Sequence, residues 1–288
     1  MSLQLHQSLN LLLLLIIGSF TANVHLAWMD IVLIITFTLL IEHLLLYFNN
    51  TRTFYFSYSA VTTAVGVIVL IYANTLWIYF FIITLGLAQK HFLTLDAKHF
   101  FNPSNFALIV GLLFFYEDAH LITGQFGDEV LFSMLVFVLA LSILVRVGRV
   151  LIPFLFVFFY LFLQYLLVVY FDPSITFQHL YHRFYSVTFM LFIYFMLTDP
   201  CVTPSKWKEQ TLFVFLVVLL ATLLDRFYGF RVQHLFMSLF FFSFFVHFES
   251  FKKLRPSELK FLLTILFVIM SALVYIEHQA PYYFEMNG

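Results

Sequence analysis

Long apolar stretches alternate with short polar segments along almost the whole chain. A helix needs roughly 20 apolar residues to cross the hydrocarbon core of a bilayer, so this pattern predicts a series of membrane-spanning helices. We predict eleven of them, at about residues 7–25, 28–48, 57–74, 76–93, 103–116, 129–146, 150–171, 184–198, 210–225, 232–249 and 259–277. The fifth and eighth are short, which is typical of helices that are tilted, broken or buried in protein.

The composition identifies the solvent that surrounds these helices. Of the 288 residues, 63% are hydrophobic and only 10% are charged. A soluble domain carries about 25% charged residues, so the composition favours a bilayer over water. We therefore predict an all-α polytopic membrane protein, with a single helical domain over residues 1–288 and a first helix that is retained rather than removed as a signal. No basic cluster suggests a nucleic-acid partner.

The single cysteine, Cys201, excludes an internal disulfide and the usual cysteine-rich zinc and iron–sulfur sites. We accordingly predict no metal site. The sequence also lacks the glycine-rich phosphate loops, the serine-hydrolase elbow and the HExxH zinc motif. Nothing in it therefore supports nucleotide hydrolysis or acyl transfer.

Basic residues are distributed unevenly between the two sides of the predicted helices. If the N-terminus is cytoplasmic, eleven of the 14 Lys and Arg residues fall inside and three fall outside. Cytoplasmic loops carry an excess of Lys and Arg, so we predict an N-in, C-out orientation. The inside residues are Arg52, Lys90, Lys98, Arg146, Arg149, Lys206, Lys208, Lys252, Lys253, Arg255 and Lys260, and the outside residues are Arg183, Arg226 and Arg231.

Two polar turns then lie together on the cytoplasmic side. They are His99-Phe-Phe-Asn-Pro-Ser-Asn-Phe106 and Phe195-Met-Leu-Thr-Asp-Pro-Cys-Val-Thr-Pro-Ser205. In each, an Asn or Asp directly precedes a proline, which ends or begins a helix and frees backbone groups near the membrane interface. Such groups need protein, water or a ligand as partners. Two ordinary helix-ending turns explain the pattern about as well as a site does.

A few charged residues fall within or beside the apolar stretches. Glu42 is either a functional intramembrane acid or a residue that reaches the interface or pairs with Arg52, and we weigh the two explanations equally. Asp225 and Arg226 fit an interfacial pair better than a site. Three of the 11 histidines, His43, His234 and His247, lie inside predicted helices, and the others lie at the helix ends or outside the helices. The three inside lack the facing arrangement that a b-type heme requires.

Small residues occur on the third and fourth predicted helices, namely Thr62, Thr63, Gly66 and Gly86. Small side chains let neighbouring helices, or a flat ligand, approach closely. Helix packing alone is the favoured explanation.

Several of these segments, taken in order, resemble one known family. Ser59-Ala-Val-Thr-Thr-Ala-Val-Gly66 is followed by a span with Trp77, then by Gly86–Lys90 and by Asn102-Pro103. The second half continues with Phe195-Met-Leu-Thr-Asp-Pro200, Lys206-Trp207 and a span that ends at Asp225-Arg226. Over about residues 28–250 this resembles the NqrB/RnfD family, whose members are membrane components of the Rnf complex and of the sodium-translocating NADH:quinone oxidoreductase.

The resemblance implies a membrane subunit of an oxidoreductase that binds flavin, as riboflavin or FMN, and relays electrons within a redox complex or to quinone. It also implies partner membrane or redox subunits and a bacterial inner membrane. The family attaches an FMN to the threonine of a Ser-Gly-Ala-Thr motif in the outer loop after the fifth span. That loop here, residues 116–128, lacks the motif, and Thr123 is the nearest substitute. We therefore predict non-covalent flavin and no covalent FMN at Thr123. The span at about 259–277 lies beyond the family's usual end.

A bound isoalloxazine ring needs a flat apolar slot with polar contacts along its edge. The residues that we expect to supply these contacts are Asn102, Ser104, Asn105, Thr198, Asp199, Thr203, Thr62 and Thr63. No residue is predicted to be catalytic. Two other functions suit the same helical frame: transport of a small solute, which includes flavin itself, and a membrane scaffold without a cofactor.

Overall fold

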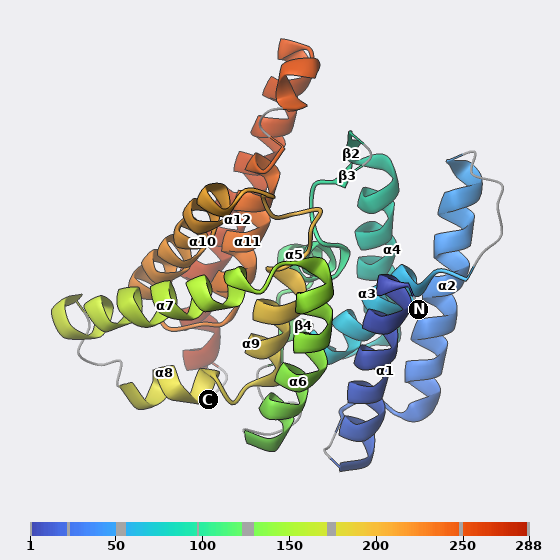
Figure 1. Cartoon of the computed structure of the whole chain (residues 1–288), viewed down its shortest axis with the longest axis horizontal. Helices are drawn as coiled ribbons and strands as arrows, with labels where there is room; N and C mark the ends of the chain where they lie inside the picture. Colours follow the sequence, from blue (N-terminus) through green and yellow to red (C-terminus); the bar gives the residue numbers. More distant parts are fainter. Residues whose placement is uncertain are drawn as a thin grey trace.

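The computed structural model describes residues 2–21, 24–49, 56–96, 98–122, 130–171, 177–247 and 250–286 (Figure 1). Within these ranges the chain is largely helical, so the all-α prediction is confirmed. The helices are α1 (Leu3–Thr21), α2 (Trp28–Phe48), α3 (Tyr58–Leu70), α4 (Leu76–Phe92), α5 (Pro103–Phe114), α6 (Val130–Val147), α7 (Leu151–Leu166), α8 (Phe177–Arg183), α9 (Val187–Leu191), α10 (Trp207–Tyr228), α11 (Gln233–Phe245) and α12 (Pro256–Met286). The π-helical segments η1 (Leu167–Phe171) and η2 (Phe192–Met196) continue α7 and α9, and the 3-10 turn η3 (Ser250–Lys253) precedes α12.

Each of the eleven predicted stretches contains a helix, but the helices fall into two classes by length. Among the described residues, six helices are long and apolar enough to cross a membrane: α1, α2, α6, α7 with η1, α10 and α12. The remaining apolar helices are α3, α4, α5, α9 with η2, and α11, each of 10–17 residues. A helix of 12 residues such as α5 is only about 18 Å long. The count of eleven complete crossings therefore stays a prediction.

The long helices expose apolar side chains on their outer faces. Leu40 on α2, Leu131 on α6, Phe154 on α7 and Phe267 on α12 are all more than half exposed. Large apolar side chains exposed along several long helices suit a surface that faces lipid. The chain is therefore a membrane protein by the character of its surface as well as by helix length.

The short helices α3 and α5 form the centre of the core. Ten of the 13 residues of α3 are buried, and so are nine of the 12 residues of α5. The chain leaves α3 through strand β1 (Ile71–Ala73), which pairs antiparallel with β4 (Ala119–Leu121). The buried hydroxyl of Tyr79 donates to the carbonyl of Ile71 and accepts the N–H of Ala73. This explains why the predicted span 57–74 ends its helix early: the last residues become a strand.

A second small ladder leads into α5. Strand β2 (Thr94–Leu95) pairs with β3 (Lys98–His99), and His99 is the partner of Thr94. The polar turn then begins, and α5 starts at Pro103, the position that proline favours in a first helical turn. Gln89 on α4 holds the loop because its Nε2 donates to the Phe101 carbonyl over 2.9 Å.

Two groups of helices repeat one order of contacts. In the first group α1 packs on α3, α2 on α4 and α4 on α5, and in the second α6 packs on α9, α7 on α10 and α10 on α11. The groups also meet through equivalent helices, since α1 contacts α6 and α5 contacts α11. This is the contact pattern of an internal structural repeat. Helices α8 and α12 have no counterpart among the described helices of the first group, and the first turns of α12 extend beyond the other helices (Figure 1).

Gly86 allows the close approach of α4 and α5. A Cβ atom at this position would lie 2.7 Å from the backbone oxygen of Pro103 and 3.2 Å from Cβ of Ala107. We therefore expect Gly86→Ala to lower the free energy of unfolding by about 1–3 kcal/mol, because α5 and its first turn must move. Thermal or denaturant unfolding in detergent measures this change.

Gly111 on α5 provides the matched control. A Cβ atom there would meet nothing within 4 Å. Gly111→Ala should therefore be neutral or stabilise the protein by up to about 1 kcal/mol, as alanine does inside helices. If both variants lower the free energy of unfolding equally, the close contact of α4 and α5 at Gly86 does not explain the loss.

Candidate functional site

Asn102 joins the two polar turns. Its Nδ2 atom donates to Oδ2 of Asp199 over 2.9 Å. Its Oδ1 atom accepts the N–H groups of Ser104 and Asn105 at 3.1 and 3.2 Å, so the same side chain caps α5. Asn at an N-cap position satisfies donors that would otherwise be unpaired. The sequence predicted that the turns lie together, and this hydrogen bond is how they meet.

A cavity of about 260 Å³ opens beside this hydrogen bond. It lies between α1, α3 and the start of α5 on one side, and α6, η2 and the following turn on the other. A small extension of about 30 Å³ reaches Gly66 and Leu70 on α3. The main cavity is lined by Leu3, Gln4, Gln7, Ser59, Thr62, Thr63, His99, Asn102, Pro103, Ser104, Ile143, Val147, Tyr194, Phe195, Thr198, Asp199, Pro200 and Cys201. The lining therefore combines hydroxyl and amide groups with two aromatic rings.

Six of the eight predicted contact residues line this cavity: Thr62, Thr63, Asn102, Ser104, Thr198 and Asp199. The other two do not. Asn105 points away, and its Nδ2 atom donates to the carbonyl of Phe236 on α11 over 3.3 Å. Thr203 is buried in the second turn, where its hydroxyl donates to the Asp199 carbonyl over 2.7 Å. Both residues therefore support the site without facing the cavity.

The second turn is held in place by contacts from both sides. Thr198 donates to the carbonyl of Tyr194, in the π-helical segment η2, over 2.6 Å. Nη1 of Arg149, just before α7, donates to the carbonyl of Pro204, and Gln210 on α10 donates to the same carbonyl over 3.2 Å. π-Helical turns are frequent at functional sites, and this one presents Tyr194 and Phe195 to the cavity.

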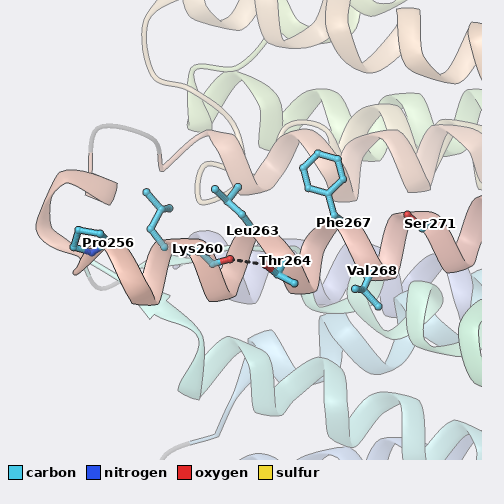
Figure 2. A pocket seen from close by; sticks show the side chains of 8 residues that line it. Pro256, Lys260, Leu263, Thr264, Phe267, Val268 and Ser271 are labelled. Atoms are coloured by element: carbon cyan, nitrogen blue, oxygen red, sulfur yellow. Dashed lines mark hydrogen bonds between the residues drawn. The ribbon is translucent and has the colours of Figure 1, made fainter.

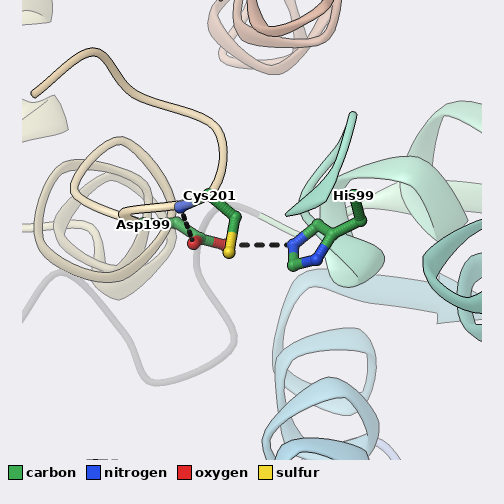
Figure 3. A group of neighbouring side chains, drawn as sticks. All are labelled: His99, Asp199 and Cys201. Carbon is green, nitrogen blue, oxygen red and sulfur yellow. Dashed lines mark hydrogen bonds and ion pairs between the residues drawn. The ribbon is translucent and has the colours of Figure 1, made fainter. Parts of the chain in front are cut away.

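His99, Asp199 and Cys201 meet at the wall of the cavity (Figure 3). Nε2 of His99 lies 3.8 Å from Oδ2 of Asp199, and the N–H of Cys201 donates to Oδ1 of Asp199 over 2.9 Å. Burial alone would lower the pKa of His99, but Asp199 and Cys201 outweigh it and raise the pKa to about 9. Burial would raise the pKa of Asp199, yet His99, Cys201 and Asn102 hold it below its usual value. The carboxylate of Asp199 thus favours the protonated form of His99, and His99 in turn favours the ionised form of Asp199.

Glu42 lies at a different place and is fully buried. Its carboxylate accepts from Lys90 Nζ at 2.7 Å and from the hydroxyl of Ser57 at 3.0 Å, and it lies 2.9 Å from Nε2 of His91. The side chain joins α2, the end of α4 and the N-cap of α3. This supports a structural role and not exposure at the interface; the predicted partner Arg52 lies outside the described residues.

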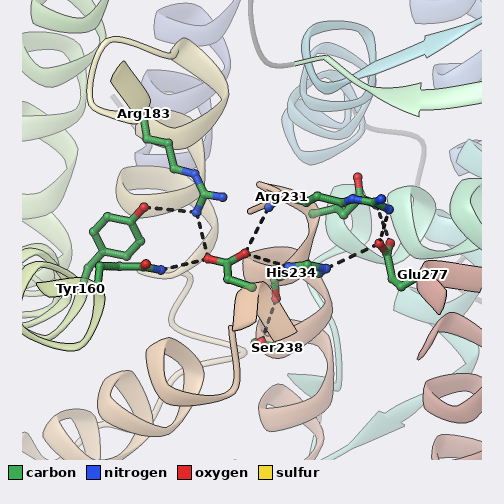
Figure 4. Close-up of polar contacts among 9 residues, drawn as sticks. Tyr160, Arg183, Arg231, His234, Ser238 and Glu277 are labelled. Atoms are coloured by element: carbon green, nitrogen blue, oxygen red, sulfur yellow. Dashed lines mark hydrogen bonds and ion pairs between the residues drawn. The ribbon is translucent and has the colours of Figure 1, made fainter. Parts of the chain in front are cut away.

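A second buried cluster contains Arg183, His234 and Glu277 (Figure 4), and the carboxylate of Asp225 lies at its centre. Gln164 and Arg183 donate to its Oδ2 atom at 2.9 and 3.4 Å. Its Oδ1 atom lies 2.7 Å from Nδ1 of His234 and accepts the backbone N–H of Arg231 at 3.1 Å. The interpretation of Asp225 and Arg226 as an interfacial pair was wrong: Asp225 is 1% exposed and pairs with Arg183, while Arg226 is exposed.

The last helix completes this cluster. Glu277 on α12 is 2% exposed and accepts from Nη1 of Arg231 at 2.7 Å and from Gln233. Nε2 of His234 lies 3.5 Å from the same carboxylate. The cluster therefore links five helices, α7, α8, α10, α11 and α12, through charges that are nearly all hidden from solvent.

A larger hollow of about 620 Å³ runs along α12 (Figure 2). All the residues that line it belong to this one helix, from Pro256 to Ser271, and most of them are apolar. A groove on a single exposed apolar helix fits the lipid-facing surface of a membrane protein. It lacks the convergent polar groups that a binding site needs.

Two side chains at the cavity that carry chemistry, His99 and Cys201, were not predicted from the sequence. Both belong to the two segments that the sequence singled out, but only the Asn, Asp, Ser and Thr residues there were expected to contact a ligand. Their proximity depends on how β3 meets the second turn, about 100 residues away in the chain, which local spacing does not reveal. Thr123, the residue considered for covalent FMN, lies outside the described residues.

Comparison of the chain with known proteins leaves the expected family without independent support. The resemblance to the NqrB/RnfD family therefore rests on the motifs and their order alone. No family model matches the sequence, and no curated protein is significantly similar to it.

Proposed function

We propose that the chain is a divergent relative of the NqrB/RnfD family that binds flavin non-covalently in the Asn102–Asp199 cavity. In this proposal it relays electrons to quinone or to a partner redox subunit in a bacterial inner membrane. The single observation that carries the proposal is the hydrogen bond between Asn102 and Asp199. It joins the two turns that resemble the family's motifs at one polar-edged cavity.

The proposed topology has eleven spans with the N-terminus in the cytoplasm. The support for this topology is that eleven Lys and Arg residues fall on the cytoplasmic side and only three on the outer side. In this orientation the cavity opens toward the cytoplasm, because the first residues of α1 and the last residues of α6 line it. The Asp225 cluster then lies toward the opposite face.

The residues at the cavity fit an isoalloxazine ring. Such a ring has carbonyl acceptors and an N–H donor along one edge. The carbonyl groups suit the ring N–H of His99. The N–H group suits the hydroxyl oxygens of Thr62, Thr63 and Ser104, whose own protons donate to backbone carbonyls. Tyr194 and Phe195 offer aromatic contacts for its faces. The volume of about 260 Å³ is close to the lower limit of about 300 Å³ for small-molecule sites, so the ribityl chain would leave through the opening.

The chain's own residues would bind and orient the ligand. Asn102 would fix the starting point of α5, and the His99 cation would favour negative charge at the nearby edge of the ring. The bound flavin would supply the redox chemistry, and the protein would supply its position and electrostatic environment. The buried α3 and α5 would exclude water from one side of the cavity.

The direct test is the cofactor content of the protein purified in a mild detergent. We expect a flavin absorbance band, and a flavin that denaturation releases intact for mass spectrometry, because no covalent attachment is proposed. Thr62→Val and Ser104→Ala should each lower flavin occupancy, since each removes a hydroxyl from the cavity lining. The unfolding temperature of the variants reports whether they remain folded.

Thr264→Val is the control for these variants, because Thr264 is exposed on α12 and lies outside the cavity. It should leave flavin occupancy unchanged. Purified protein that holds no flavin and does not take up added riboflavin or FMN would overturn the proposal.

Transport of a small solute is the second candidate. Two short helices, α3 and α5, favour this function. Both begin at the same cavity, and both are too short to cross a bilayer. Transporters often build their sites from such interrupted helices. Uptake of riboflavin into liposomes by protein without a bound chromophore would favour transport over electron transfer.

A further inference from the structure

We propose that His99, Asp199 and Cys201 form a site for a divalent transition-metal ion of the Zn²⁺ type, with one coordination position open to the cavity. This inference does not depend on flavin binding. It concerns the three side chains that the two turns bring together. It replaces the sequence-based prediction that the protein has no metal site.

The distances suit a single ion. Zn²⁺ holds nitrogen and oxygen ligands at about 2.0–2.2 Å and sulfur at about 2.3 Å, which sets tetrahedral ligand atoms roughly 3.3–3.8 Å apart. Nε2 of His99 and Oδ2 of Asp199 are 3.8 Å apart. The ligand atoms of all three residues lie within 4.8 Å of one another. A side-chain adjustment of about 1 Å would therefore close the site around an ion.

Nε2 of His99 also lacks a hydrogen bond. The atom is shielded from solvent, and it has no hydrogen-bond partner among the described residues. A buried polar atom without a partner is costly, and such an atom in a native protein calls for a missing partner. A metal ion that displaces the proton of this imidazole would be that partner, and its positive charge would take the place of the charge on the protonated ring.

Neighbouring groups hold the ligands in position. Asn102 and the Cys201 N–H donate to the two carboxylate oxygens of Asp199. The carbonyl of His99 lies 3.2 Å from Nε2 of His247, and β3 pairs with β2. Outer contacts of this kind orient metal ligands and tune their affinity.

The ligand types select the class of metal. A thiolate and an imidazole favour Zn²⁺ and similar transition ions, while Mg²⁺ and Ca²⁺ prefer sites made of oxygen ligands. Three protein ligands leave one position for water or a bound ligand, as in zinc sites that act on substrates. Because all three residues line the cavity, that position would face it.

Co²⁺ is a sharp probe because the chain contains only one cysteine. We expect Co²⁺ added to the protein, purified without a histidine tag, to produce a thiolate-to-cobalt charge-transfer band at one ion per chain. Zn²⁺ should displace it. Any such band must come from Cys201. Zn²⁺ should also protect Cys201 of the unmodified protein from alkylation, a measurement that needs no variant.

Cys201→Ser and His99→Gln should each weaken Zn²⁺ binding by at least about tenfold, and Asn102→Ala by about 10- to 100-fold through loss of an outer contact. His43→Gln is the control, since His43 is far from the turns in sequence and does not line the cavity. Absence of a thiolate–cobalt band, or unchanged Zn²⁺ affinity in Cys201→Ser, would overturn the metal site. Neither result would alter the flavin content, so the two proposals fail separately.

Discussion

Asp225→Asn is expected to lower the free energy of unfolding by about 3–5 kcal/mol, the cost of breaking a buried charge pair by removing one partner. The substitution keeps the shape of the side chain and removes its charge. Arg183, which is only 6% exposed, then keeps its positive charge without a counter-ion. Thermal or denaturant unfolding in detergent micelles measures the loss.

The size of this effect follows from the number of groups that share the carboxylate. Gln164, Arg183, His234 and the backbone of Arg231 all contact it. An asparagine presents an NH₂ group where one oxygen stood, so at least one of these donors faces another donor. Unsatisfied buried donors cost about 1–3 kcal/mol each, which adds to the charge penalty.

The neighbouring residue provides the control. Arg226 is exposed, and Arg226→Gln should change the free energy of unfolding by less than about 1 kcal/mol. Arg183→Met combined with Asp225→Asn should recover part of the loss, because the double variant leaves no lone charge between these two residues. An Asp225→Asn loss below about 1 kcal/mol, the value of a surface pair, would mean that water reaches the cluster.

Glu42→Gln should destabilise the protein by about 2–3 kcal/mol, somewhat less than the Asp225 substitution. Glu42 is fully buried, but the side chains of its partners Lys90 and His91 are 17% and 10% exposed. These partners can regain some contact with water when the carboxylate charge is lost. The free energy of unfolding again measures the change.

Glu258 is the matched acid for this experiment. It is paired with Arg255 three residues away on the exposed first turn of α12. Glu258→Gln should therefore have an effect below about 1 kcal/mol. If both substitutions cost the same, the three contacts of Glu42 contribute no more than a surface pair does.

The sequence was sufficient to locate the apolar helices and to predict that the two polar turns lie together. Span 28–48 coincides with α2, and Pro103 begins α5 where the Asn-Pro pair predicted a helix start. Hydrophobic length and proline act locally, so they can be recognised without knowing the fold. Thr62 was a candidate as a small residue on the third predicted helix, and Asn102 as part of the Asn-Pro turn; both line the one cavity.

The short elements and the buried charges could not be predicted in the same way. Helix α8 has no apolar stretch of its own in the sequence. The β1–β4 ladder pairs residues about 50 positions apart. Asp225 looked like an interfacial residue because it stands beside Arg226 at the end of a helix. Its partners come from α7, α8, α11 and the turn before α11. Burial of a charge is decided by that tertiary arrangement rather than by sequence neighbours.

The contact between Glu277 and Arg231 has a consequence for biosynthesis. The two residues are 46 positions apart, and α12 leaves the ribosome after every other described helix. At about 5–20 residues per second, Arg231 is made about 2–9 s before its acidic partner. Until then Arg231 and Gln233 lack the carboxylate that they contact in the finished fold. The contacts of Arg231 and Gln233 are therefore completed only once α12 has arrived, so insertion of the helices before α12 does not complete this cluster.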